Sequence, residues 1–324
     1  MVPSQPSVVV AGTVAAVIAD SVARRRSVVR SVLRWYGENA RDLPWRRPGT
    51  SPWAVMVSEF MLQQTPVERV RGPWQQWLER WPSPAALAAA PPGEAVRAWG
   101  RLGYPRRALR LHAAAVAIAE QHDGIVPADR EALLQLPGVG SYTAAAIASF
   151  AYGRREVVLD TNVRRVLCRV DSGLAHPGVA PTVAEVATAT AHLPAEPARA
   201  ARWAVAVMEL GALVCVARTP RCGQCPVRDQ CAWRAAGYPA EDGPPRRGQS
   251  YTGTDRQCRG ALLAVLRSSD VAVEGGKLAT AWAEPQQRER ALASLLADGL
   301  AVLLPGDHYA LPGHPDVAGG PGSP

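Results

Sequence analysis

Residues 130–152, REALLQLPGVGSYTAAAIASFAY, contain two helical patterns joined by a tight hairpin. The hairpin is Leu136-Pro137-Gly138-Val139-Gly140. Its two glycines flank one apolar residue and let the chain turn sharply with its N–H groups facing outward. Together with the N-terminus of the next helix, those N–H groups form a site for an anion such as a phosphate. Taken alone, the pattern fits an ordinary tight corner between helices equally well.

A cysteine cluster follows the hairpin by 75 residues. Four of the six cysteines share a stretch of 17 residues, at Cys215, Cys222, Cys225 and Cys231. Four thiolates this close can hold a [4Fe–4S] cluster or a zinc ion. Structural zinc usually takes two C-x-x-C pairs and only one is present, so the spacing favours iron and sulfur. Arg218 and Arg221 lie inside the loop and suit phosphate contacts. The simpler alternative is a loop that only holds the surrounding helices together.

Composition narrows the class of protein. The chain has 324 residues, 48% of them hydrophobic, and a net charge of +8. These values indicate a sizeable core and favour a polyanionic partner. Lys277 is the only lysine, so a GC-rich genome is a second explanation for the arginine-rich composition. The apolar stretch at residues 8–19 has no basic residue before it and is too short to cross a bilayer. We therefore expect an intracellular, reducing location, where clustered cysteines bind metal.

The chain divides into five predicted segments. Residues 1–26 are expected to form a flexible tail and residues 27–234 an all-α core with short connections. The expected helices of this core are 52–64, 66–81, 105–121, 130–135, 142–152, 161–169, 182–192 and 197–214. A Gly- and Pro-rich linker follows at 235–255. Residues 256–312 are predicted to form a small α+β unit, with helices at 259–266 and 285–298 and strands at 300–304 and 308–311. This order resembles a winged helix, and a short β-containing remnant fits about as well. Residues 313–324 are expected to be disordered.

A series of motifs resembles the adenine DNA glycosylases of the MutY type, in the helix-hairpin-helix or endonuclease III superfamily. The motifs occur in the order of that family and cover residues 28–234. They are Pro44-Trp45-Arg46, residues 59–65 (EFMLQQT), Leu102-Gly103-Tyr104, the hairpin, residues 159–163 (LDTNV), residues 208–211 (MELG) and the cysteine loop. The resemblance implies an all-α fold of two helical subdomains with a [4Fe–4S] cluster. It also implies a base excision repair enzyme that removes adenine mispaired with 8-oxoguanine or guanine.

Two carboxylates carry the expected chemistry. Breaking a C–N glycosidic bond needs one acid to protonate the leaving base and one carboxylate to stabilise the positively charged sugar. Glu59 lies within an apolar helix, and such surroundings favour the protonated form that a general acid needs. Asp160 precedes a helix and is equally well explained as its N-cap, which would keep it ionised. The resemblance assigns Asp160 the stabilising role and places Asn162 beside it as an orienting group.

Tyr142 separates this chain from the lyases of the same fold. Two residues after the last hairpin glycine, bifunctional relatives such as endonuclease III have the lysine that forms a Schiff base. Tyr142 stands there instead, and residues 1–276 contain no lysine. A lyase of this kind needs an amine nucleophile. We therefore predict a glycosylase without lyase activity, in which Tyr142 supports catalysis by hydrogen bonding.

The adenine must leave the duplex to meet Glu59. By resemblance, Gln64 and Tyr104 are the wedge that fills the gap, with Gln63, Thr65 and Leu102 beside them near the opposing base. Trp45 and Arg46 match one wall of the adenine pocket and Glu209 a contact on its far side. Each residue also has a simpler explanation. Trp45 and Leu102 fit a hydrophobic core, and Gln64 and Arg46 fit an ordinary surface.

The chain departs from the family at three places. Pro105 replaces a second tyrosine, Ala204-Val205 replaces an Asn-Gln pair, and residues 256–312 are too few for the C-terminal domain that helps relatives recognise 8-oxoguanine. Two alternatives stay open at this point: an endonuclease III-like glycosylase for another damaged base, and a non-enzymatic iron–sulfur DNA-binding regulator. The expected partner is double-stranded DNA with an A:8-oxoguanine or A:G mispair, bound by a monomer at the nucleoid of a bacterial cytoplasm.

Overall fold

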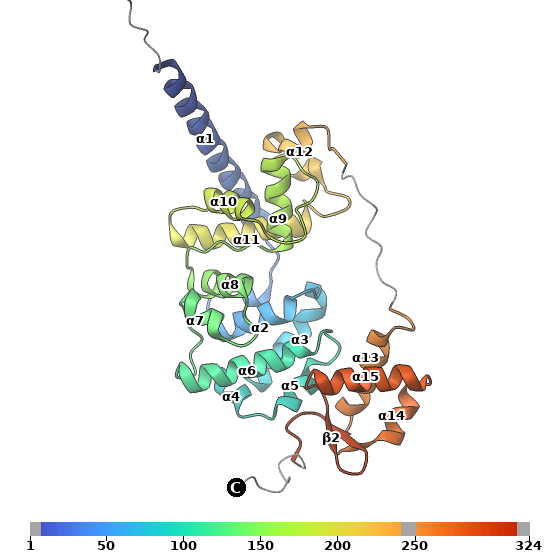
Figure 1. The fold of residues 1–324 in the computed structure, drawn as a ribbon. Helices are drawn as coiled ribbons and strands as arrows, with labels where there is room; N and C mark the ends of the chain where they lie inside the picture. Colours follow the sequence, from blue (N-terminus) through green and yellow to red (C-terminus); the bar gives the residue numbers. More distant parts are fainter. Residues whose placement is uncertain (1–7, 241–250, 316–324) are drawn as a thin grey trace, which may run out of the picture. The chain divides into compact units, whose positions relative to one another are not determined.

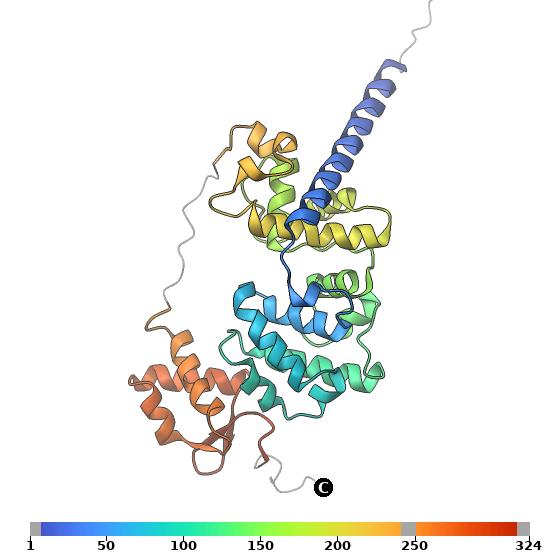
Figure 2. The ribbon, with the colours of Figure 1, turned by 180° about the vertical axis from the view of Figure 1, so that it is seen from behind.

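The structure, a computed structural model, describes residues 8–240 and 251–315 (Figures 1 and 2). The chain forms two compact units, and each is discontinuous in sequence. The first comprises residues 1–42 and 148–244, and the second residues 43–147 and 245–324. The boundary falls within helix α8 (Ser141–Tyr152). The predicted all-α class with two helical subdomains and a small C-terminal part with strands is confirmed.

The first unit is built around a layer of valines and leucines. Val32, Val163 and Leu210 are almost completely buried in this core, as is Trp203. Its elements are α1 (Val8–Asn39), α9 (Thr161–Leu167), a π turn (Cys168–Ser172), α10 (Val183–His192), α11 (Pro197–Leu213), two 3₁₀ turns (Cys222–Gln224 and Arg228–Gln230) and α12 (Ala232–Ala235). Helix α10 begins with a capping box formed by Thr182 and Glu185.

The expectation of a flexible tail at residues 1–26 is wrong for residues 8–26, which belong to α1. Arg24 anchors the end of this stretch. Its guanidinium forms an ion pair with Asp171 at 2.9 Å and donates hydrogen bonds to the carbonyls of Val170 and Gln230, both at 2.7 Å. These contacts attach α1 to the turn beside the cysteine loop. Partners so distant in sequence leave no local periodicity, so the pattern of residues 1–26 did not indicate a helix.

The helical part of the second unit has a core rich in tryptophan. The indole centroid of Trp77 lies 4.7 Å from that of Trp81 and 5.6 Å from that of Trp99, both edge to face. Two further buried indoles donate hydrogen bonds, Trp53 to the carbonyl of Trp81 and Trp74 to that of Ala54. The elements are η1 (Pro44–Arg46), α2 (Pro52–Leu62), α3 (Val67–Arg80), α4 (Pro84–Ala88), α5 (Pro92–Trp99), α6 (Arg106–Gln121) and α7 (Arg130–Gln135).

The C-terminal part of the second unit contains three helices and one small sheet. Its elements are α13 (Asp255–Arg267), β1 (Val273–Glu274), α14 (Gly275–Ala281), α15 (Pro285–Ala297), β2 (Val302–Leu304) and β3 (His308–Ala310). Strand β3 lies between β1 and β2 and is antiparallel to both, with Tyr309 opposite Val273 and Leu303. This order of helices and strands is that of a winged helix. The sequence did not predict α14, which begins with two glycines, or the two-residue strand β1.

Some predicted features lie outside the described residues. These are residues 241–250 of the predicted linker, residues 316–324 of the predicted C-terminal tail and the first seven residues. Among the described helices, none is both long and apolar enough to cross a membrane.

Candidate active site

Helix α2 holds the predicted acid, Glu59, in an apolar setting. The Ser51 side chain accepts a hydrogen bond from the Ala54 N–H, and Pro52 occupies the first turn, so the helix begins as the sequence predicts. All residues from Trp53 to Met61 are buried, and Glu59 is only 6% exposed. A carboxyl group at this position is costly unless it is protonated or hydrogen-bonded.

Tyr142 supplies that hydrogen bond. It lies in the first turn of α8, directly after the hairpin, and its phenol O–H donates to Oε2 of Glu59 at 3.0 Å. The residue that replaces the lyase lysine thus contacts the proposed acid. Gln63, just past the end of α2, comes within 3.5 Å of the Thr143 hydroxyl on the same helix. The structure therefore gathers the 59–63 segment and the start of α8 at one place.

The hairpin has the conformation that its glycines indicate. Gly138 has φ +78°, and a Cβ at that position would lie 2.7 Å from Cβ of Arg110, so a larger residue would clash. Val139 is buried and anchors the turn, while Gly138 and Gly140 are exposed. Because α7 ends at Gln135 and α8 begins at Ser141, the five predicted residues form the connection between two helices. The helix-hairpin-helix motif is present.

The two wedge candidates share an unusual backbone conformation. Gln64 has φ +55° and Tyr104 φ +47°, a region that residues with a side chain rarely occupy. Gln64 is exposed, and Tyr104 is 45% exposed despite its large ring. Strained residues of this kind persist when their surroundings hold them, and they gather at functional sites. Both features agree with side chains presented to a ligand.

Arg107 holds these two loops together and was not predicted from the sequence. Its guanidinium is buried on α6 and donates to the carbonyls of Phe60, Met61, Gln63 and Gly103 and to the Thr65 hydroxyl, at 2.6–3.0 Å. Burial lowers the pKa of Arg107 to about 10, which still leaves it charged at neutral pH. In the sequence it is one arginine among many, and only the convergence of five acceptors distinguishes it.

Replacing Arg107 with methionine is expected to lower the free energy of unfolding by about 2–3 kcal/mol, because buried carbonyls lose their donors. Urea denaturation followed by circular dichroism measures this change. Arg106→Met is the matched control, since Arg106 is 55% exposed in its ion pair with Asp298 and is worth at most about 1 kcal/mol. Equal losses of stability for the two variants would show that Arg107 does not hold the two loops together.

The structure favours packing roles for several other candidates. Trp45 is 6% exposed, and its ring lies 5.7 Å from that of Trp74, edge to face. Leu102 is buried, and its carbonyl accepts from the buried Thr65 hydroxyl at 3.2 Å. Arg46 is half-buried as the last residue of η1. Trp45 and Leu102 therefore pack inside the protein, whereas Arg46 stays partly accessible.

In the first unit, Asp160 is the N-cap of α9. One carboxylate oxygen accepts from the Val163 N–H at 2.6 Å and the other from Nδ2 of Asn162 at 2.7 Å. Burial nevertheless raises the pKa of Asp160, and these hydrogen bonds and the charge of Arg165 only oppose that shift. The sequence led us to expect that capping alone would keep the group ionised. That expectation overlooked its burial.

A hydrogen-bond chain runs from Asp160 to the cysteine loop. Arg165 donates through Nη2 to Oδ1 of Asn162 at 2.8 Å and through Nε to the Cys215 carbonyl at 2.7 Å. Gly211 on α11 makes room for this chain, because a Cβ there would lie 2.6 Å from Cβ of Asn162. Asn162 thus contacts the carboxylate that we expect it to orient. Arg165, which the sequence did not reveal, connects the carboxylate to the first cysteine.

Glu209 lies on α11 of the same unit with an exposed fraction of zero. Both of its oxygens accept from Arg41, at 2.7 Å from Nε and 2.8 Å from Nη2. This bidentate pair holds α11 to the segment after α1. The arrangement favours a structural role over the predicted contact with adenine.

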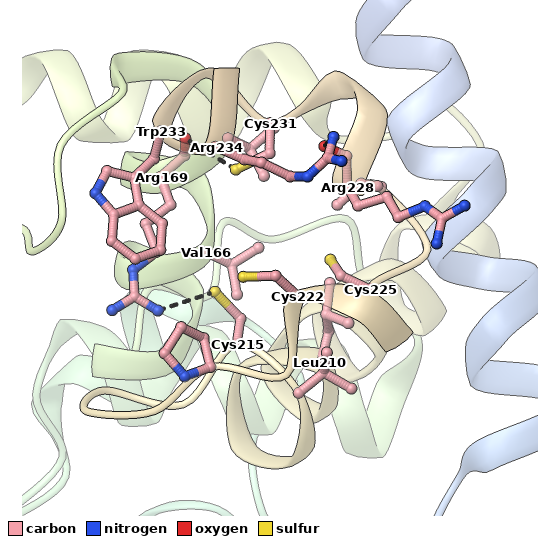
Figure 3. A pocket seen from close by; sticks show the side chains of 14 residues that line it. Val166, Arg169, Leu210, Cys215, Cys222, Cys225, Arg228, Cys231, Trp233 and Arg234 are labelled. Carbon is pink, nitrogen blue, oxygen red and sulfur yellow. Dashed lines mark hydrogen bonds between the residues drawn. The ribbon is translucent and has the colours of Figure 1, made fainter. Parts of the chain in front are cut away.

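The four predicted cysteines surround one pocket, and their sulfur atoms face its interior (Figure 3). Apolar side chains such as Val166 and Leu210 also line it. Arg169 donates to Sγ of Cys215 at 3.3 Å, and its own carbonyl accepts from Sγ of Cys231 at 3.4 Å. Arg218 and Arg221 are exposed on the loop, as phosphate contacts require.

The residues of this pocket fit a cluster better than a single ion. Burial raises the pKa of Cys215, and that of Cys225 to about 12, so the thiolates need a cationic group among them. In the described part of the chain, no three Cys, His, Asp or Glu side chains converge closely enough to bind one metal ion. The sulfurs instead stand around a shared space, as an iron–sulfur cluster requires.

Protein purified without oxygen is expected to contain about four iron and four sulfide ions per chain. Metal analysis and acid-labile sulfide determination give both values. Cys222→Ser should lower both contents because it removes one ligand, whereas Cys258→Ser, on α13 in the other unit, should leave them unchanged. One zinc ion per chain without sulfide would contradict this interpretation.

Comparisons with known proteins agree with this fold and with the iron–sulfur loop. A family model described as HhH-GPD superfamily base excision DNA repair protein matches residues 57–187, and one described as iron–sulfur binding domain of endonuclease III matches residues 215–231. The solved structure of a thermostable thymine-DNA glycosylase has a TM-score of 0.60 and 25% identity, covering 66% of this chain and 98% of that chain. A non-covalent endonuclease III–DNA complex, at TM-score 0.57 and 22% identity, covers 67% and 97% and shares the fold.

The fold and the site thus define a helix-hairpin-helix DNA glycosylase with a [4Fe–4S] cofactor. The adenine DNA glycosylase of Mycobacterium tuberculosis (strain CDC 1551 / Oshkosh) is 56% identical over 284 residues, which are 87% of this chain and 93% of that protein. The chain belongs to the adenine DNA glycosylase family of the HhH-GPD superfamily.

Proposed function

We propose that this protein is a monofunctional glycosylase that removes adenine mispaired with 8-oxoguanine or guanine in duplex DNA. The observation that carries the proposal is the buried Glu59, held by a hydrogen bond from Tyr142 where lyases of this fold have a lysine. The family of the chain and the name of its mycobacterial relative support adenine as the base.

Glu59 is the general acid in this proposal. Tyr142 donates to Oε2 and so directs the transferable proton to Oε1. As the C1′–N9 bond breaks, the adenine ring takes that proton and leaves as a neutral base. Water then attacks C1′, and the carboxylate of Glu59 accepts its proton, which leaves an abasic site and restores the acid.

Asp160 stabilises the cationic sugar while the bond breaks. Its carboxylate is fixed by the Val163 N–H and by Asn162, so it is oriented before the substrate arrives. Burial raises the pKa of Asp160 in the free protein. The approaching positive charge of the sugar favours the ionised form and offsets this burial. Arg165, held by the Cys215 carbonyl, acts through Asn162 and positions the carboxylate.

DNA binding uses three further features. The hairpin N–H groups at Gly138–Gly140 bind a backbone phosphate, and Arg218 and Arg221 add charge from the cysteine loop. Gln64 and Tyr104 occupy the space left by the extruded adenine. We propose that the protein acts as a monomer on chromosomal DNA in the bacterial cytoplasm, since none of these roles requires a second copy.

The protein is expected to release adenine without cutting the strand. Strand cleavage by a Schiff-base mechanism needs an amine near C1′, and Tyr142 offers a phenol. A labelled duplex should therefore stay intact after the reaction until it is treated with alkali or heat. Borohydride should trap no protein–DNA adduct. Nicking by the purified protein in neutral buffer would refute the absence of lyase activity.

Single-turnover base release from duplexes with adenine opposite 8-oxoguanine, guanine or cytosine tests the proposed function. We expect release opposite 8-oxoguanine and guanine and much slower release opposite cytosine. Parallel duplexes carrying thymine glycol test the alternative of another damaged base. Release of that base, with adenine left in place, would overturn the proposal.

A further inference from the structure

The C-terminal part of the chain is attached to α5 and α6 by reciprocal arginines. Arg97 on α5 donates to the carbonyls of Arg267 and Ser269 at the end of α13. Arg267 in turn donates to the carbonyl of Val96 at 2.9 Å and to that of Gly100 at 2.6 Å. Burial lowers the pKa of Arg267 to about 10, so it stays charged at neutral pH. Charged donors buried against carbonyls make this a fixed joint rather than a surface contact.

Two further contacts fix the orientation of this part. Asp298, at the end of α15, pairs with Arg106 on α6 at 3.1 Å and with Arg259 on α13 at 2.6 Å. The Gly93 N–H donates to the Pro312 carbonyl at 2.7 Å, and a Cβ on Gly93 would lie 2.5 Å from that oxygen. The C-terminal part therefore packs on the helices that carry the Tyr104 loop.

This joint places Arg256, at the start of α13, beside the wedge candidate Tyr104. Cζ of Arg256 lies 4.8 Å from the ring centroid of Tyr104, and Cζ of Arg107 lies 5.6 Å from it. The exposed, strained tyrosine is thus held by one guanidinium from its own domain and one from the C-terminal part. Each contact is a cation–π interaction, which restricts where the ring can lie.

The charge of the C-terminal part argues against independent binding of DNA. Residues 251–315 contain six Lys and Arg against seven Asp and Glu, whereas the whole chain has a net charge of +8. Helix α15, which would enter the groove in a winged helix, exposes Glu289 beside Arg290, and the turn between β2 and β3 carries Asp307. Phosphate contacts from this surface would be few.

We propose that the C-terminal part is a brace for the wedge, in which Arg256 positions Tyr104 for insertion beside the opposing base. The proposal rests on the proposed function. It assigns residues 251–315 a role in the catalytic cycle through a single exposed arginine, and it makes Arg256 a positioning residue that acts through Tyr104.

A double-mutant cycle tests this brace in the full-length protein. Single-turnover adenine release is measured opposite 8-oxoguanine for the wild type, Arg256→Ala, Tyr104→Ala and the double variant. The fluorescence of 2-aminopurine next to the mispair reports wedge insertion. Arg290→Ala, on the exposed face of α15, is the matched control for loss of one arginine.

We expect Arg256→Ala to slow release and insertion about two- to five-fold, while affinity for undamaged duplex stays unchanged. In the Tyr104→Ala background, the same substitution should have no further effect. Arg290→Ala should behave as the wild type. An equal loss from Arg256→Ala in both backgrounds, no loss in either, or a loss of duplex affinity with Arg290→Ala would overturn the brace. A wild type that releases no adenine would refute the proposed function itself, and the brace with it.

Discussion

Replacing Glu59 with glutamine is expected to slow single-turnover release of adenine by about 10²–10⁴-fold. The substitution keeps the size of the side chain, and the amide oxygen can still accept the hydrogen bond from Tyr142. It removes only the transferable proton, so the leaving adenine must depart as an anion. The rate is measured at saturating protein on a duplex with adenine opposite 8-oxoguanine.

Two controls accompany this variant. Its affinity for the mispair and its iron content should equal those of the wild type, because the apolar setting of α2 is unchanged. Glu68→Gln makes the same replacement at an exposed side chain on α3 and should leave the rate unaltered. A Glu59→Gln protein that releases adenine at the wild-type rate would show that Glu59 is not the general acid.

Asp160→Asn separates the capping role of this residue from its charge. Asparagine caps a helix as well as aspartate does, so the Val163 N–H keeps its acceptor. Its NH₂ group cannot accept the hydrogen bond from Asn162, so the free energy of unfolding should fall by about 1–3 kcal/mol. The rate of adenine release should still fall by about 10²–10³-fold, because the carboxylate no longer faces the cationic sugar. Thermal unfolding and single-turnover kinetics on one preparation give both numbers.

Asp129→Asn is the matched control for this variant. Asp129 caps α7 in the same manner, by accepting from the Ala132 N–H, and lies in the other unit. Its substitution should leave the rate unchanged. If Asp160→Asn loses stability and not activity, Asp160 is a cap alone.

The pH dependence follows from the same residue. Burial raises the pKa of Asp160 above its ordinary value, so the ionised form is lost at a higher pH than for an exposed aspartate. The rate of release should therefore fall as pH decreases through this raised pKa. The pH–rate profile of Asp160→Asn should lack this fall at low pH.

Local patterns predicted much of the fold and the site. The Ser51-Pro52 start of α2, the hairpin glycines and the cysteine spacing each depend on neighbours in sequence, and the structure has them where expected. The burial of Glu59 followed from the apolar residues around it. In each case the physical cause lies within a few residues of the group concerned.

Features that depend on distant partners were not predictable in this way. Arg107 is defined by acceptors at residues 60–65 and 103, and Arg165 by a carbonyl 50 residues away. Burial of Asp160 depends on packing in the first unit, so its raised pKa was missed. The docking of the C-terminal part through Arg97 and Arg267 joins segments about 170 residues apart. A single sequence holds no sign of such pairings.

A crystal structure of Glu59→Gln bound to a duplex with adenine opposite 8-oxoguanine tests most directly whether the two carboxylate positions act on one nucleotide. We predict that the adenine is extruded, that a ring nitrogen lies within hydrogen-bond distance of the side chain at residue 59, and that Asp160 faces C1′ of the same sugar. An adenine left in the stack, or one whose sugar lies far from Asp160, would contradict the mechanism.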